Sequence, residues 1–444
     1  MIWKRLLHGV GANAFNQVGI AIVQLVTVPA LSTRWGLDVY GWWILVSAIP
    51  SYIALSDLGF ATAAGNEMTM ALARKESARA DGVFQSSWAL ISIISAFLAV
   101  IIFTALVILP DSYLTATGID ATTTRTVALL LSGQSLGILQ SGILLAAFRA
   151  SGRYALGTAI QGMINISEGI SVILIVWAGG GALMAAVALF LVRMVGVATQ
   201  RFLLNRVESR FSWGLRKASV AEIRALAKPA FAALSLPIAQ ASFLQGTNIA
   251  IGAASSAADV ATFSAVRTLI RVGIQAVTLL NHATLPEFSA VVARKEREKE
   301  LQLCLLTFGW CLLVLAPMGI LIGTFGPLLV SVWSRGAIHA NEHLIVMMSV
   351  VMVINGLWHP VSNLLLAINK HPLFAYPYAA LALTSVGVTY FAVKWAGILG
   401  AAFSLLLLDS CMFALVSLLF MRFIAKPIEL LHALTISFHS VLGR

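Results

Sequence analysis

The chain has 444 residues, of which 59% are hydrophobic and only 11% are charged, and its mean hydropathy is +0.91. A soluble globular protein of this size keeps a polar surface and has about a quarter of its residues charged, so the composition excludes that class. The formal net charge of +11 by itself is compatible with a nucleic-acid partner, but the basic residues concentrate in the connections between apolar segments.

Long apolar segments recur along the whole chain. Backbone that faces lipid must satisfy its own hydrogen bonds, and these segments far exceed the roughly ten residues of a barrel strand, so each is predicted to be a helix. The predicted spans are 10–31, 40–62, 84–108, 126–148, 154–177, 182–203, 227–249, 258–284, 301–326, 343–367, 372–392 and 396–421. The predicted fold is therefore all-α, a polytopic membrane protein with about twelve transmembrane helices.

Most of the 29 basic residues fall in alternate connections between these spans. The first group is Lys4 and Arg5, and the densest runs from Arg201 to Lys228. The positive-inside rule places such connections, and with them both chain termini, in the cytoplasm. The basic balance is therefore a signal of membrane topology, and we expect no nucleic-acid partner.

Two segments, one in each half of the chain, follow the same plan. The first runs from Leu37-Asp38-Val39 to Ala73-Arg74-Lys75-Glu76, and the second from Ala258-Asp259-Val260 to Ala293-Arg294-Lys295-Glu296. A one-residue gap aligns them, which predicts an internal duplication. We expect a six-helix lobe over residues 1–212, a second over 213–425, and a cytoplasmic, weakly amphipathic tail over 426–444. Membrane transporters are often built from two repeats with the substrate path between them.

Residues that carry catalysis in enzymes form no recognisable motif in this chain. It contains no catalytic triad, zinc motif or nucleotide-binding loop, and its predicted external connections are too short to hold a catalytic domain. Cys304, Cys311 and Cys411 all fall within predicted spans, where packing is a more natural role than a disulfide or a metal site. We therefore expect no enzyme activity, no cofactor and no bound metal.

The strongest polar pattern lies in the predicted eighth span. Its polar residues step by three or four and share one helix face: Ser264, Arg267, Thr268, Arg271, Gln275, Thr278 and His282. Two arginines in lipid together cost roughly 6 kcal/mol, so the sequence must provide a partner or a solvated space. Acidic neighbours that neutralise them are one interpretation, and an anion-binding cavity is the other. Asp409 is the one acid clearly within a span of the C-terminal half, which favours the cavity.

Two further predicted spans carry polar residues at helical spacing. In the first span they are Asn13, Asn16, Gln17, Gln24 and Thr27, and in the seventh Ser235, Ser242, Gln245 and Asn248. Hydrogen bonds between packed helices are the alternative explanation for each span taken alone. Because the duplication pairs the first span with the seventh and the second with the eighth, we expect these four helices to wall one central cavity.

Charged residues further from the ends of predicted spans include Asp57, Glu168 and Arg193. Asp57 is compatible with a proton or cation coupling site, with a partner for one of the arginines, or with an interfacial position. Glu168 and Arg193 both lie at mid-span within the first lobe. Because unpaired charges are costly in hydrocarbon, we expect these two residues to form a structural ion pair.

The stretch from Tyr40-Gly41-Trp42-Trp43 through Ser56-Asp57-Leu58-Gly59-Phe60 to Asn66 resembles the second helix of bacterial polysaccharide flippases. These are the Wzx-like O-antigen and capsule exporters of the multidrug/oligosaccharidyl-lipid/polysaccharide (MOP) superfamily. The resemblance implies a V-shaped pair of lobes with a cavity lined by the first, second, seventh and eighth helices. It also implies flipping of an undecaprenyl-diphosphate-linked oligosaccharide across the bacterial inner membrane for lipopolysaccharide or capsule synthesis, beside glycosyltransferases and a polysaccharide polymerase.

The same resemblance suggests roles for individual residues. Arg267 and Arg271 would hold the diphosphate, and Arg34 would contribute at the external mouth. The remaining candidates for lining the substrate path are Gln275, Asn16 and Gln24. The lipid tail would stay among the membrane lipids.

Two related classes and one unrelated class, a sugar polymerase, fit the sequence less well. Lipid II flippases usually have fourteen helices. Cation-coupled MATE-type multidrug exporters rely on an acid in the first helix, whereas no Asp or Glu precedes Asp38 here, and a positive cavity repels cationic drugs. A membrane-embedded sugar polymerase would need a sizeable external loop rich in charged residues.

Overall fold

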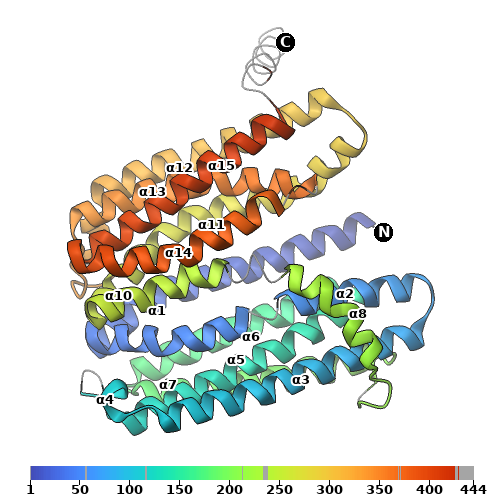
Figure 1. Cartoon of the computed structure of the whole chain (residues 1–444), viewed down its shortest axis with the longest axis horizontal. Coiled ribbons are helices and arrows are strands. Elements are labelled where there is room, and N and C mark those ends of the chain that lie inside the picture. Colours follow the sequence, from blue (N-terminus) through green and yellow to red (C-terminus); the bar gives the residue numbers. More distant parts are fainter. Residues whose placement is uncertain are drawn as a thin grey trace. The chain divides into compact units, whose positions relative to one another are not determined.

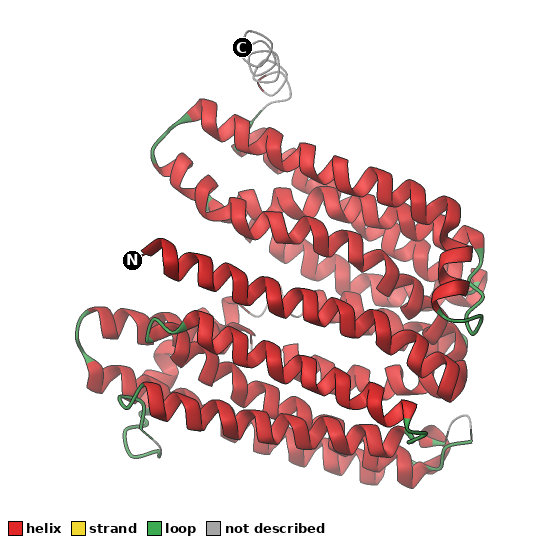
Figure 2. Ribbon diagram, turned by 180° about the vertical axis from the view of Figure 1, so that it is seen from behind, coloured by secondary structure: helices red, strands yellow, loops and turns green. Residues whose placement is uncertain are grey.

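The computed structural model describes residues 2–55, 58–115, 118–212, 214–233, 239–368, 370, 372–425 and 429. Throughout these residues the regular structure is helical, as Figures 1 and 2 show. The elements are α1 (Ile2–Leu55), α2 (Leu58–Ala73), α3 (Ser77–Ile108), α4 (Asp111–Leu114), α5 (Ala121–Ala150), α6 (Tyr154–Trp177), α7 (Ala182–Val207), α8 (Val220–Ala233), η1 (Ser242–Gly246), α10 (Thr247–Ala254), α11 (Ala257–Ala293), α12 (Arg297–Trp333), α13 (Glu342–Ala367), α14 (Pro372–Ala396) and α15 (Ile398–Phe423).

The chain is an all-α polytopic membrane protein. Within the described ranges, 10 helical stretches are long and apolar enough to cross a membrane. The first, Gly11–Ile53, covers two predicted spans, because Gly36 adopts φ 79° and ψ 169° and divides α1 into two helices. Only glycine adopts this backbone conformation without strain. The predicted seventh span corresponds to α8, η1 and α10, and its residues 234–238 lie outside the described part.

The described chain divides into two compact units. Unit 1 comprises Met1–Gly252 and Ser256–Ala261, and unit 2 comprises Ala253–Ser255 and Thr262–Arg444. The predicted boundary between the lobes, after residue 212, stays a prediction. A division of the chain into compact units does not test it, because such units need not end where duplicated halves end. The predicted amphipathic tail, 426–444, lies outside the described residues except for Glu429.

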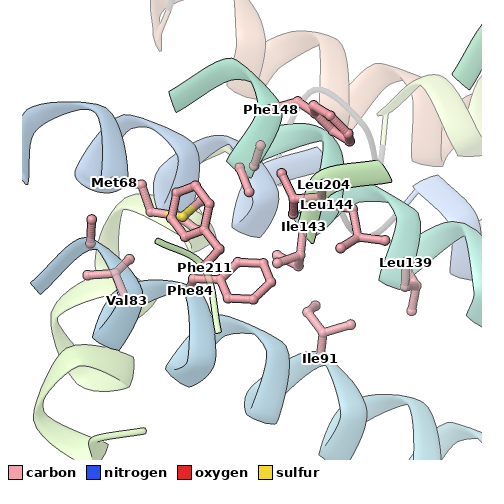
Figure 3. Close-up of a cluster of buried hydrophobic side chains, with 14 of the residues drawn as sticks. Met68, Val83, Phe84, Ile91, Leu139, Ile143, Leu144, Phe148, Leu204 and Phe211 are labelled. Atoms are coloured by element: carbon pink, nitrogen blue, oxygen red, sulfur yellow. The ribbon is translucent and has the colours of Figure 1, made fainter. Parts of the chain in front are cut away.

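Unit 1 is built around α1, α5, α6 and α7. The first half of α1 packs along α6, and α5 packs against α7. Glycines allow the close approach of α1 and α6: a Cβ added at Gly169 would lie 2.0 Å from Cγ1 of Val23. Figure 3 shows a hydrophobic core in this unit, with Met68 from α2, Phe84 from α3 and Phe148 from α5.

The connection after α7 is fastened to the N-terminal end of α3. The Phe211 ring lies 5.2 Å from the Phe84 ring, and both residues are buried. The Asp81 carboxylate accepts hydrogen bonds from the Ser212 backbone N–H at 2.8 Å and from Lys217 Nζ at 2.8 Å. These contacts hold the basic connection, which the positive-inside rule predicts to be cytoplasmic, against the end of unit 1.

Unit 2 packs α13 against α12 and α15, with α14 alongside α15. Asp409 of α15 is 0% exposed. Its Oδ1 accepts hydrogen bonds from Asn355 Nδ2 at 2.8 Å and Trp358 Nε1 at 2.9 Å, both on α13. Asp409, the acid that the sequence places clearly within a span of the C-terminal half, thus joins α15 to α13.

We expect Asp409→Leu to destabilise the protein more than Asp409→Asn. The leucine leaves Trp358 Nε1, buried in α13, without its acceptor, and such a loss costs about 1–3 kcal/mol. The asparagine retains an oxygen at the Oδ1 position. Thermal unfolding of the purified variants in detergent measures the difference, and equal losses for the two variants would show that these hydrogen bonds contribute little.

The two predicted repeats end in the same turn. Lys75 and Lys295 both have positive φ, 64° and 60°. The Lys75 N–H donates to Leu72 O at 3.0 Å and the Glu76 N–H to Ala71 O at 2.9 Å. The equivalent bonds, from Lys295 to Val292 and from Glu296 to Val291, measure 3.0 and 3.2 Å. This pair of hydrogen bonds is the Schellman ending of a helix.

The likeness extends past the turn. Arg79 pairs with Glu76 at 3.6 Å at the start of α3, and Lys299 pairs with Glu296 at 2.8 Å at the start of α12. A local backbone conformation, its hydrogen bonds and an ion pair therefore recur at the C-terminal end of each predicted repeat, and the duplication itself stays a prediction.

Glycine at either turn is expected to stabilise the protein. A lysine side chain disfavours the left-handed backbone by about 1–2 kcal/mol, whereas glycine avoids this cost and is preferred at the position after a helix. Lys75→Gly and Lys295→Gly should each raise the midpoint of thermal unfolding. Arg74→Gly is the matched control, since its backbone is not left-handed, and it should lower the midpoint. A rise for neither lysine variant would contradict this account.

Candidate functional site

The predicted polar face of the eighth span lies on α11 in unit 2. One side of this helix is packed, with Val266, Ile270 and Val277 at most 2% exposed. Arg267, Arg271 and Gln275 are half-buried. At about 100° per residue Arg271 and Gln275 lie on the opposite side of the helix from these packed residues, and Arg267 lies between the two sides, next to the buried Phe263. Arg271 therefore occupies the less tightly packed side of α11.

The two threonines on this face are satisfied by the helix itself. The Thr268 hydroxyl donates to Ser264 O and the Thr278 hydroxyl to Ile274 O, both at 2.8 Å. A hydroxyl has a single proton, so neither threonine has one left for a ligand. Arg267, Arg271 and Gln275 carry guanidinium and amide donors on this face.

The guanidinium groups have different surroundings. Arg267 lies over the buried Phe263 ring, 5.5 Å from its centroid, in a cation–π contact. Arg271 forms no ion pair with any acid in the described part of the chain. Asp409 uses Oδ1 to bind Asn355 and Trp358 instead. One interpretation of the sequence was that a carboxylate neutralises each arginine. For Arg271, no carboxylate of the described residues does so.

The other predicted substrate contacts lie on α1 in unit 1. Arg34 is exposed, two residues before the turn at Gly36, whereas Asn16 and Gln24 are half-buried. Beside Arg34, the Trp35 Nε1 donates to Gly180 O at 3.0 Å. This hydrogen bond ties α1, next to its kink at Gly36, to the connection between α6 and α7. These residues and the α11 arginines belong to different units, so their common site remains a prediction. Asp57 lies outside the described residues.

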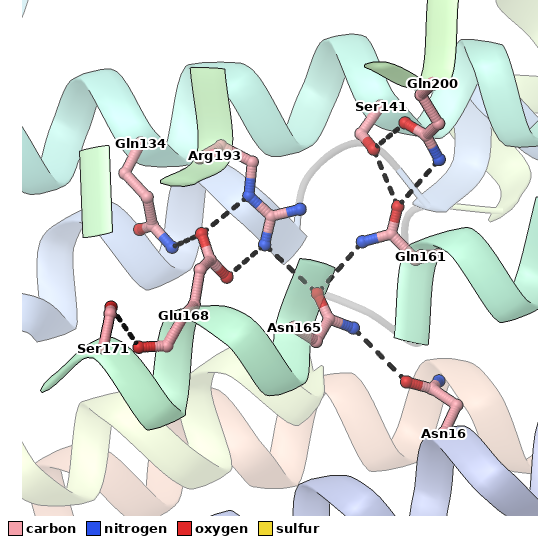
Figure 4. Close-up of polar contacts among 9 residues, drawn as sticks. All are labelled: Asn16, Gln134, Ser141, Gln161, Asn165, Glu168, Ser171, Arg193 and Gln200. Carbon is pink, nitrogen blue, oxygen red and sulfur yellow. Dashed lines mark hydrogen bonds and ion pairs between the residues drawn. The ribbon is translucent and has the colours of Figure 1, made fainter. Parts of the chain in front are cut away.

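Glu168 of α6 and Arg193 of α7 are brought together in unit 1 (Figure 4). Arg193 is 1% exposed and Glu168 6%. Arg193 Nε donates to Glu168 Oε1 at 2.8 Å, and Nη2 donates to Oε2. Gln134 Nε2 of α5 donates to the same Oε1 at 2.9 Å. This buried pair joins three helices.

The ion pair continues into a chain of amides that the sequence reasoning missed. Asn165 Oδ1 accepts from Arg193 Nη2 at 3.1 Å and from Gln161 Nε2 at 3.0 Å. Gln161 Oε1 in turn accepts from Ser141 at 2.7 Å and from Gln200 at 3.2 Å. Toward α1, Asn165 Nδ2 donates to Asn16 Oδ1 at 3.5 Å. The helical spacing of Gln161, Asn165 and Glu168 was the available signal.

Comparisons with known proteins reveal likeness in structure alone. No family model matches the chain, and no curated protein matches it either. An inward-facing multidrug resistance MATE family transporter of the MOP superfamily superposes with a TM-score of 0.75 at 15% identity, covering 94% of this chain and 96% of that one. The lipid II flippase MurJ, in an inward closed conformation, gives a TM-score of 0.70 at 11% identity, covering 97% and 90%.

A MOP superfamily transporter from Pyrococcus furiosus gives a TM-score of 0.58 at 16% identity, covering 92% of this chain and 95% of that one. That protein is described as having a binding pocket of reverse polarity, which suggests a different function for it. The chain therefore has the fold of MATE transporters of the MOP superfamily and of the lipid II flippase MurJ.

Proposed function

We propose that the protein is a flippase for undecaprenyl-diphosphate-linked oligosaccharides, which it moves from the inner to the outer leaflet of the bacterial inner membrane. The carrying observation is Arg271, a half-buried guanidinium that no described carboxylate neutralises, one turn from Arg267 on the same face of α11. A fixed positive charge in a membrane protein needs an anionic partner. In this proposal the partner is the diphosphate of the substrate.

Arginine suits this role by geometry as well as by charge. Its planar guanidinium offers parallel N–H groups that match the oxygens of a phosphate, and such charge-assisted hydrogen bonds are stronger than neutral ones. Gln275, one further turn along the face, supplies an amide for a sugar or phosphate oxygen. The similarity in fold to a lipid II flippase supports a lipid-linked substrate.

Topology and driving force complete the proposal. With both termini in the cytoplasm, the basic connections face the leaflet in which lipid-linked sugars are assembled. An inward-negative membrane potential favours outward movement of anions by about 2.3 kcal/mol per charge per 100 mV. Glycosyltransferases would supply the substrate and a polysaccharide polymerase would consume it.

A second candidate function is cation-coupled export of small molecules, as in MATE transporters. The TM-score of 0.75 to such a transporter supports it. Arginines on the polar face of α11 oppose it, because they repel the cationic drugs that such exporters carry. The reverse pocket polarity described for the Pyrococcus furiosus transporter, which suggests a different function for that protein, is a precedent within this fold.

Reconstitution in liposomes distinguishes the two functions. The purified protein is expected to expose a fluorescent undecaprenyl-diphosphate-linked oligosaccharide to a membrane-impermeant quencher added outside, and to leave a cationic dye undisturbed under a proton or sodium gradient. Dye transport without lipid translocation would refute the flippase function and support the exporter function. Protein-free liposomes give the background rate.

A further inference from the structure

The direction of the amide groups in the unit 1 network is set by Arg193. An asparagine side chain offers an acceptor oxygen on one side and a donor NH2 on the other, whereas a guanidinium only donates. Arg193 Nη2 lies 3.1 Å from Asn165 Oδ1, and Gln161 Nε2 reaches the same oxygen at 3.0 Å. The oxygen of Asn165 must therefore face Arg193, and its NH2 must face away.

This direction passes on to Asn16. The Nδ2 of Asn165 donates to Asn16 Oδ1 at 3.5 Å, a long hydrogen bond, so the oxygen of Asn16 faces α6. Figure 4 shows Asn16 at this end of the chain of amides. Gly162 leaves room for α1 and α6 to approach closely at this level, because a Cβ added there would lie 3.2 Å from Asn16 Oδ1. The side chain of Asn16 is half-buried, and its NH2 is the end turned away from α6.

We infer that the Glu168–Arg193 pair is a positioning device, which turns Asn16 so that it presents a hydrogen-bond donor to acceptor oxygens of the substrate. The inference rests on the proposed function, in which Asn16 lines the substrate path. A reversed amide would present its oxygen to substrate oxygens that only accept hydrogen bonds, such as those of a phosphate, and that contact is repulsive. Glu168 is required because Arg193, at 1% exposed, would otherwise be an uncompensated buried charge.

The sharpest test moves the negative charge without changing the total. In the double variant Glu168→Gln with Asn165→Asp, Arg193 still faces one carboxylate, now at position 165, where Nη2 already lies 3.1 Å from Oδ1. A carboxylate offers oxygens on both sides, so Asn16 must turn its NH2 toward α6 and its oxygen away. The net charge of the network is unchanged, and the direction of Asn16 is inverted.

Translocation kinetics in liposomes are the readout. The double variant should raise the KM for an undecaprenyl-diphosphate-linked oligosaccharide roughly tenfold, the loss expected for one hydrogen bond to a charged group, with kcat unchanged. Asn16→Leu should raise the KM by a similar factor. The triple variant should raise it no further, because both changes remove the same donor. Additive effects, or an unchanged KM for Asn16→Leu, would overturn the inference.

The same measurements with undecaprenyl diphosphate that carries no sugar show whether Asn16 contacts oxygens of the diphosphate or of the sugar. A raised KM for this lipid as well assigns the contact to the diphosphate, and a raised KM for the sugar-linked lipid alone assigns it to the sugar.

A second variant applies if the double variant fails to fold. Asn165→Ala keeps the Glu168–Arg193 pair and frees Asn16 to rotate, and its KM should rise roughly threefold. An unchanged KM for Asn165→Ala refutes the inference. A wild type that moves neither lipid refutes the proposed function and the inference with it, whereas unchanged variants of an active wild type refute the inference alone.

Discussion

Arg271→Gln is expected to slow translocation of an undecaprenyl-diphosphate-linked oligosaccharide by roughly 10- to 100-fold. A hydrogen bond to a charged group contributes about 1.5–3 kcal/mol, and each 1.4 kcal/mol is about a tenfold change. Because Arg271 has no carboxylate partner in the described ranges, the glutamine leaves no buried acid unpaired. The variant should therefore fold and insert normally. Initial rates in liposomes with matched amounts of protein measure the effect.

Two further variants define what the site requires. Arg271→Lys keeps the charge but loses the planar pair of N–H donors, so an intermediate rate is expected. Lys394→Gln removes one positive charge from an exposed position of α14, where Nζ lies 4.6 Å from the Tyr390 ring, and should leave the rate unchanged. Equal loss in Lys394→Gln and Arg271→Gln would point to a general effect of charge and away from a site on α11.

The largest effect on stability is expected from Glu168→Ala. The substitution leaves the Arg193 guanidinium buried between α5, α6 and α7 without its counterion, and breaking such a pair costs about 3–5 kcal/mol. Gln134 loses its acceptor as well. Thermal unfolding in detergent, followed by intrinsic fluorescence, should show a midpoint several degrees below that of the wild type.

Removing both charges distinguishes the free-energy cost of leaving Arg193 unpaired from the contribution of the ion pair itself to stability. Glu168→Gln with Arg193→Met should lose less stability than Glu168→Ala alone, since no charge remains unpaired. Arg79→Ala is the surface control: its side chain is 43% exposed beside Glu67 and Glu76, and exposed pairs contribute about 1 kcal/mol or less. A double variant less stable than Glu168→Ala would contradict the interpretation of the pair as a neutralised buried charge.

Hydropathy and helical spacing were sufficient to predict the all-α membrane fold, because lipid imposes helices on any long apolar segment. The same spacing identified the polar face of α11, and the cost of isolated charges in the membrane correctly predicted the ion pair between Glu168 and Arg193. The repeated tetrapeptide Ala-Arg-Lys-Glu predicted the duplication, and its two copies form the same turn.

Other features depend on tertiary packing and escaped prediction. The anchoring of Ser212 and Lys217 by Asp81 joins residues far apart in the sequence, which periodicity within one helix cannot reveal. The direction of Asn165 depends on a guanidinium from α7, and spacing alone contains no information about which way an amide faces.

Equilibrium binding of undecaprenyl diphosphate to the purified protein in lipid nanodiscs tests the central claim most directly. The wild type is expected to bind this lipid saturably, with an affinity that falls as ionic strength rises. Arg267→Gln with Arg271→Gln should abolish saturable binding, whereas Lys394→Gln should bind as the wild type does. Undiminished binding by the double arginine variant would contradict the assignment of the diphosphate to α11.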